Sequence, residues 1–195
     1  MCIIILILCL KMPFLSLGLL IALSLISKPA FAESKALNPG IDSFTFGIMQ
    51  QDVESKPVED SISINLEVLF ATKLKRLPWS PQPVVGATIN TDNDTNQLYG
   101  GMTWQYDFSE RFYTEIFLGG AIHDGEEDPD TPQAGNREAH RAYGCPLNFR
   151  ESLSFGWRLS SQYSLMATVS HMSNASLCDA NDGLTNAGIR FSRRY

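Results

Sequence analysis

A strict alternation of apolar and polar residues runs through most of the chain after residue 40. The clearest case is SISINLEVLF at residues 61–70, where every second residue from Ile62 to Phe70 is apolar. A period of two is that of a β-strand with two different faces. The same alternation predicts eight strands in all, at residues 44–50, 61–70, 83–90, 98–108, 112–122, 149–159, 163–173 and 186–195. No helical periodicity of useful length follows the N-terminal segment, so the sequence predicts an all-β protein.

The connections between these segments alternate in character. LKRLPWSPQ, FSER and SSQ follow the second, fourth and sixth segments, and the last two are short turns. The odd-numbered segments lead into polar links, and residues 124–148 form the longest. Short turns at one rim, longer loops at the other and an even number of strands are typical of a small outer-membrane barrel. We therefore predict an eight-stranded antiparallel transmembrane β-barrel whose apolar residues face lipid. A secreted β-sandwich or a soluble lipocalin-like barrel is the alternative.

The N-terminal segment has the features of a secretory signal peptide. It is an apolar run, broken by Lys11, that ends in Ala30-Phe31-Ala32, which fits an A-x-A cleavage site. We expect residues 1–32 to be removed and residues 33–195 to form the barrel domain. The alternative is an uncleaved anchor, but the apolar run at 14–26 is shorter than the ~20 residues that span a bilayer.

The charge of the mature chain excludes one class of partner. The chain from residue 33 on has 13 basic and 21 acidic residues, a net charge of −8. Nucleic-acid binding favours a basic surface, so no nucleic-acid partner is expected.

Two cysteines, Cys145 and Cys178, remain in the predicted mature chain. Export leads to an oxidising compartment, where an even pair of cysteines favours a disulfide over two free buried thiols. The predicted topology places loops 124–148 and 174–184 at the same rim, so a bridge between them is sterically possible. It would restrict the segment beside His171.

His171 and Ser173 end the seventh predicted strand with the same parity as Val169. They would therefore lie on the lipid-facing side, near the loop end. Neighbours on one face of a strand are ~7 Å apart at their Cα atoms, and an imidazole can activate a serine hydroxyl to attack an ester. A histidine and a serine at this spacing are also compatible with a polar girdle at the membrane interface.

A longer pattern surrounds this pair. His171-Met-Ser173-Asn174-Ala175 is followed by Leu177, by Asn181-Asp182-Gly183-Leu184 and by a strand that ends on Tyr195. This pattern resembles the PagL-type lipid A 3-O-deacylases, and the resemblance extends back through residues 149–170 and more loosely to 112–121. It implies an eight-stranded barrel in the outer membrane of a Gram-negative bacterium that hydrolyses an acyl ester of lipid A in lipopolysaccharide. A homodimer is also compatible with it.

The resemblance implies roles for individual residues. His171 would be the general base, Ser173 the nucleophile and Asn174 an oxyanion-hole element. The family has a glutamate that orients the histidine at the position of Thr185, so this chain departs from the pattern there. Asp182 or Asp179 in the adjoining loop could substitute for it. A catalytically inactive barrel with a structural role, or one that binds a surface partner through loop 124–148, is the alternative.

The remaining polar residues fit a structural role. Arg190, Arg158 and Glu115 have inward parity and are expected to pair inside the barrel. The acidic stretch 126–130 is read as a solvated loop, and His123 and His140 as loop residues without metal-ligand spacing. The proposed chemistry requires no metal and no organic cofactor.

Overall fold

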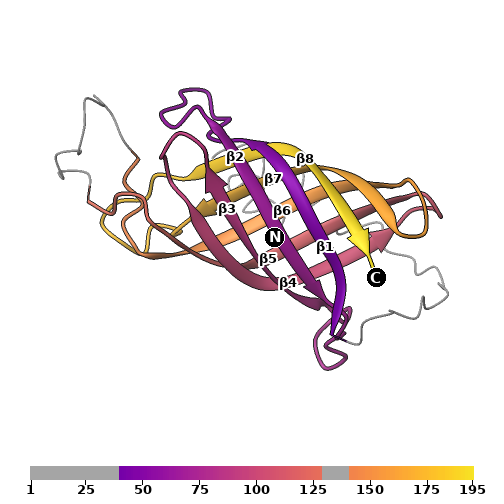
Figure 1. Cartoon of the computed structure of the whole chain (residues 1–195). Coiled ribbons are helices and arrows are strands. Elements are labelled where there is room, and N and C mark those ends of the chain that lie inside the picture. Colours follow the sequence, from indigo (N-terminus) through magenta and orange to yellow (C-terminus); the bar gives the residue numbers. More distant parts are fainter. Residues whose placement is uncertain (1–39, 129–140) are drawn as a thin grey trace, which may run out of the picture. The chain divides into compact units, whose positions relative to one another are not determined.

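The computed structural model describes residues 40–128 and 141–195, which form a closed antiparallel barrel with its strands in chain order (Figure 1). The strands are β1 (Ile41–Gln50), β2 (Ile62–Phe70), β3 (Gln82–Asn90), β4 (Gln97–Asp107), β5 (Phe112–His123), β6 (Leu147–Arg158), β7 (Tyr163–Ser173) and β8 (Leu184–Arg194). Pairing of β1 with β8 closes the sheet. The predicted eight-stranded barrel is confirmed, with strand ends within three residues of those expected. The described part of the chain contains no helix long and apolar enough to cross a membrane.

Burial along each strand follows the predicted alternation. In β1, Ser43 and Thr45 are buried while Phe44, Phe46 and Ile48 are exposed. The outward side chains of the other strands are also largely apolar, and they include Ile62, Val85, Leu98, Leu118, Phe155, Trp157 and Ile189. The barrel therefore has an apolar outer surface and a lumen that carries most of the polar side chains.

The lumen is filled by a charged and aromatic network. Arg190 on β8 reaches Glu67 Oε2 at 2.9 Å and Glu115 Oε1 at 3.2 Å. The guanidinium of Arg150 lies 3.8 Å from the centre of the Tyr99 ring. The inward pairing of Arg190 with Glu115 is confirmed. Arg158 pairs instead with Asp107, near the end of the barrel that carries the short turns.

The two rims differ as the sequence predicts. Loops 51–61, 91–96 and 174–183 lie at one rim, together with residues 124–128 after β5 and 141–146 before β6, and the connections 71–81, 108–111 and 159–162 lie at the other. The predicted signal peptide, its cleavage site after Ala32, and His140 lie outside the described residues and remain predictions.

Candidate active site

His171 and Ser173 lie at the loop end of β7, on the outward side of the barrel wall. Ser170 and Met172 are buried, whereas Val169 is exposed and both His171 and Ser173 are half-buried. The pair therefore occupies the parity that the alternation predicted. In the described chain no hydrogen bond joins Ser173 Oγ to the imidazole, and in unliganded enzymes such bonds are often long until substrate binds.

The sheet places His171 between two neighbours. Across β7 and β8 it pairs directly with Thr185, and across β6 and β7 it pairs with Glu151. Directly opposite residues have Cβ atoms about 5 Å apart. Of these two, Thr185 makes the hydrogen bond, with His171 Nδ1 and Thr185 Oγ1 separated by 2.9 Å.

A carboxylate that the sequence pattern did not predict lies next to Thr185. Thr185 Oγ1 lies 3.1 Å from Glu54 Oε1, which comes from the loop between β1 and β2. Glu54 is 131 residues away from Thr185 in sequence. It lies in a polar loop with several other acidic residues, so no spacing or motif singles it out.

Two backbone contacts fix loop 51–61 to the beginning of β8. The Val53 N–H donates to the Thr185 carbonyl oxygen at 2.8 Å, and the Asp52 N–H donates to Asn186 Oδ1 at 3.2 Å. Val53 directly precedes Glu54, and Thr185 is the residue that Glu54 contacts. The position of the Glu54 backbone is thereby set by the sheet.

Arg141 holds the acidic side chains of this loop. It donates to Asp52 from Nε at 2.8 Å and from Nη2 at 2.5 Å, and to Glu54 Oε2 from Nη2 at 3.3 Å. Burial raises the pKa of Asp52, but the hydrogen bonds from Arg141 and from the Glu59 and Val58 N–H groups outweigh it and lower that pKa below its ordinary value.

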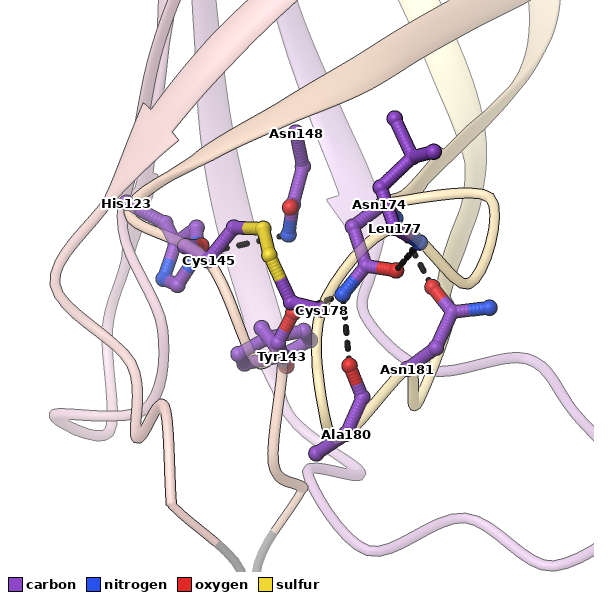
Figure 2. Close-up of a disulfide and its surroundings, with 9 residues drawn as sticks. All are labelled: His123, Tyr143, Cys145, Asn148, Asn174, Leu177, Cys178, Ala180 and Asn181. Atoms are coloured by element: carbon purple, nitrogen blue, oxygen red, sulfur yellow. Dashed lines mark hydrogen bonds between the residues drawn. A yellow bond between two sulfur atoms is a disulfide. The ribbon is translucent and has the colours of Figure 1, made fainter.

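The predicted disulfide between Cys145 and Cys178 is confirmed, with the two Cα atoms 5.9 Å apart (Figure 2). It joins the segment before β6 to loop 174–183. Asp182 reinforces the junction, because its N–H donates to the Ala142 carbonyl and its carboxylate accepts from the Ala142 N–H, both at 2.9 Å. This junction lies beside Arg141 in sequence and so helps to position it.

Asn174 is buried at the centre of the same junction (Figure 2). Its backbone N–H donates to Asn181 Oδ1 at 2.8 Å, and its side-chain Nδ2 donates to the carbonyls of Tyr143 and Ala180 at 2.7 and 2.5 Å. Its Oδ1 accepts from the Leu177 N–H. All N–H groups of Asn174 therefore have acceptors within the protein, and the residue shapes the turn that follows Ser173.

The suggested substitutes for the missing glutamate lie elsewhere. Asp182 bonds to Ala142, and among the described residues no hydrogen bond links Asp182 or Asp179 to His171. Gly183 instead packs on the imidazole, because a Cβ atom at this position would lie 2.5 Å from His171 Cε1. The glycine in the Asn181-Asp182-Gly183 motif thus leaves space for the histidine ring.

His123 has a structural contact. Its Nε2 lies 2.6 Å from the Cys145 carbonyl oxygen, and its ring packs against Tyr143. Within residues 40–128 and 141–195 no cluster of three or more His, Cys, Asp or Glu side chains could hold a metal ion.

Comparison with solved structures places the barrel in the outer-membrane class of folds. The crystal structure of the outer membrane enzyme PagL matches with a TM-score of 0.55 and 15% identity, over 77% of this chain and 98% of that one. Neisserial surface protein A matches with a TM-score of 0.54 and 6% identity, over 78% and 96%. A de novo designed transmembrane β-barrel gives 0.52 and 12%, over 83% and 100%. At these identities the likeness concerns the fold alone.

The sequence itself identifies the family. The profile of the lipid A 3-O-deacylase (PagL) family matches residues 63–194. The chain therefore belongs to this family, as the pattern around His171 and Ser173 suggested. The comparison with curated proteins found no significant match.

Proposed function

We propose that this protein is an outer-membrane serine esterase that removes an ester-linked acyl chain from lipid A, by the family's description the 3-O-linked one. The observation that carries the proposal is the anchored imidazole. His171 Nδ1 is bonded to Thr185 at 2.9 Å, which leaves Nε2 as the ring nitrogen that can act on Ser173.

The position of the pair suits a lipid substrate. His171 and Ser173 share the outer face with Val169, and exposed Phe149 and Leu153 lie on the neighbouring strand β6. In an outer membrane, this end of the barrel would lie beside the outer leaflet. The acyl ester of a lipid in that leaflet could then reach Ser173 without leaving the membrane for water. Lipopolysaccharide is then the membrane partner.

The reaction proceeds in two acyl transfers. His171 Nε2 accepts the proton of Ser173 Oγ as that oxygen attacks the ester carbonyl, and it returns the proton to the departing sugar oxygen. A water molecule, deprotonated by the same nitrogen, then releases the fatty acid from Ser173. The chemistry needs no metal or organic cofactor.

The proposed oxyanion role of Asn174 requires a change of partner. An N–H group of Asn174 can stabilise the tetrahedral oxygen only after it leaves Asn181, Tyr143 or Ala180. Substrate binding that loosens the turn after Ser173 would permit this exchange.

The test is Ser173→Ala, with lipid A analysed by mass spectrometry. We expect the variant to fold and to lose acyl release completely, because it lacks the oxygen that attacks the ester in the proposed mechanism. Ser170→Ala is the matched control, since Ser170 lies on the same strand but is buried on the inner face. Identical lipid A from wild type and Ser173→Ala would instead support the alternative of a catalytically inactive barrel.

A further inference from the structure

We propose that Glu54, acting through the hydroxyl of Thr185, is the positioning carboxylate of this site and fixes the tautomer of His171. The inference rests on the proposed function and deepens it. The family motif has an orienting glutamate at the position of Thr185, and we assign its role in this chain to Glu54. It depends on a three-residue chain of hydrogen bonds drawn from the β1–β2 loop, β8 and β7.

The direction of each hydrogen bond in this chain follows from the chemistry of its members. A carboxylate can only accept, so Thr185 must direct its single hydroxyl proton to Glu54 Oε1 at 3.1 Å. The Thr185 oxygen then has only lone pairs to offer to His171 Nδ1 at 2.9 Å. The imidazole must therefore carry its proton on Nδ1, which leaves the lone pair on Nε2.

Thr185 alone would not impose this choice. A hydroxyl can donate as readily as it accepts, and donation to Nδ1 would place the ring proton on Nε2. In that tautomer Nε2 has no free lone pair, so it cannot accept the proton of Ser173. Glu54 removes the ambiguity because it accepts a hydrogen bond from the Thr185 hydroxyl. Its negative charge also favours the imidazolium that forms during attack.

Glu54 is held well enough to do this although it is 36% exposed. The Val53 N–H donates to the Thr185 carbonyl at 2.8 Å, which ties the loop to the bridging residue itself. Arg141 binds the second Glu54 oxygen at 3.3 Å and is itself fixed by two bonds to Asp52. The carboxylate is thus fixed from both sides.

Other charged groups near the imidazole define the rival explanations. Glu151 on β6 pairs across the sheet with His171 and is close enough to interact with it electrostatically. Arg141 contributes a positive charge behind Glu54, and Asp182 lies in loop 174–183 but bonds to Ala142. Of the carboxylates, only Glu54 is connected to the imidazole by described hydrogen bonds, through the hydroxyl of Thr185.

The first experiment measures the tautomer directly. Protein labelled with ¹⁵N-histidine and refolded in detergent is examined by two-bond ¹H–¹⁵N correlation spectra near neutral pH, with His171 assigned by its loss in His171→Gln. We expect wild type to be protonated on Nδ1. Glu54→Ala should give a mixture of tautomers, and Thr185→Val should remove the preference. Asp60→Ala, which removes an exposed carboxylate from the same loop, should leave the spectrum unchanged.

The second experiment measures deacylation of lipid A by the same variants. Glu54→Ala should lower kcat by roughly tenfold to hundredfold with little change in KM, since a missing orienting carboxylate affects proton transfer more than binding. Thr185→Ser should retain activity. The double variant Glu54→Ala/Thr185→Glu should recover it, because a carboxylate then contacts the imidazole directly.

Two results would overturn the inference: an unchanged His171 tautomer and kcat in Glu54→Ala, or a loss produced by Glu151→Gln and not by Glu54→Ala. Failure of the proposed function would look different. In that case wild type would not deacylate lipid A, while the spectra would still report whether Glu54 controls the tautomer.

Discussion

Two arginines, one in the lumen and one at the loop rim, hold carboxylate pairs in similar ways. Arg190 joins Glu67 to Glu115 and is 2% exposed. Arg141 joins Asp52 to Glu54, and its side chain is 9% exposed. The lumen network continues to the buried side chains of Thr168, Ser154 and Asn65. The rim network instead continues through Thr185 to the imidazole of His171 on the outer surface.

The difference separates stability from function. The Arg190 network links facing walls of the barrel, and among the described residues none of its hydrogen bonds reaches His171 or Ser173. The Arg141 network joins loop 51–61 and the segment before β6 to strands β8 and β7, and its last member is the residue that we propose as the general base. Similar ion pairs thus stabilise the fold in one place and orient a side chain in the other, according to what lies at the end of each hydrogen-bonded chain.

The largest effect is expected from Arg190→Met. Removing one partner of a buried ion pair costs about 3–5 kcal/mol, because the carboxylates remain without their cation. The free energy of unfolding, measured by urea titration in detergent, should fall by this amount, while the folded fraction keeps its deacylation rate. Adding Glu67→Gln and Glu115→Gln should restore most of the stability. If Arg190→Met were as stable as wild type, the lumen network would have no structural role.

The disulfide should have the next largest effect. In Cys145→Ser/Cys178→Ser the unfolding free energy should fall by about 2–4 kcal/mol, since the unfolded chain regains freedom. The hydrogen bonds between Asp182 and Ala142 remain and keep the rim in place, so the folded variant should retain most of its deacylation rate. Hydrogen exchange at the backbone amides of Asp182 and Ala142 should become faster in the variant. Unchanged exchange would mean that the disulfide does not stabilise the rim.

Gly183→Ala should affect the rim and leave the lumen unchanged. The new methyl group would lie 2.5 Å from His171 Cε1 and would displace the ring. A misplacement of about 1 Å can cost about 10²-fold in rate, so we expect kcat to fall by that order with little loss of stability. Gly100→Ala is the control, because a Cβ atom there meets its nearest neighbour only at 3.6 Å. Equal activity of the two variants would contradict the packing argument.

The smallest effect concerns acid stability of the rim. The pKa of Asp52 is lowered by Arg141 and two backbone N–H groups, despite burial, which raises it. Its stabilising contribution is therefore complete above the ordinary value of 3.8 and is lost as the pH falls through the lower folded value. The stability advantage of wild type over Asp52→Asn should be constant from pH 7 to 5 and should shrink below 3.8. A constant advantage down to pH 2 would contradict this.

Much of the architecture could be predicted because its signals are local. A two-residue period reports which side chains share a face, and it gave His171 and Ser173 their outward position. Alternating short and long links define two rims, and their order along the chain predicts that Cys145 and Cys178 lie at the same one. The family motif then supplied the candidate roles.

The partner of the histidine could not be predicted in the same way. The residues near Thr185 in sequence suggested Asp182 and Asp179, whereas the structure brings Glu54 to Thr185 from the loop after β1, 131 residues away in the chain. The hydrogen bonds that Asn174 donates could not be predicted either. Their acceptors, the carbonyls of Tyr143 and Ala180, come near Asn174 only because of the way the loops pack.

The sequence by itself determined the strands, their two faces, the rims and the outward placement of His171 and Ser173, because each of these follows from the backbone period or from the order of links along the chain. Only the tertiary structure decided which charge supports the imidazole. Barrel closure pairs β1 with β8, and this places the loop after β1 beside the beginning of β8. A contact produced by closure joins residues far apart in the chain, and no local pattern records it.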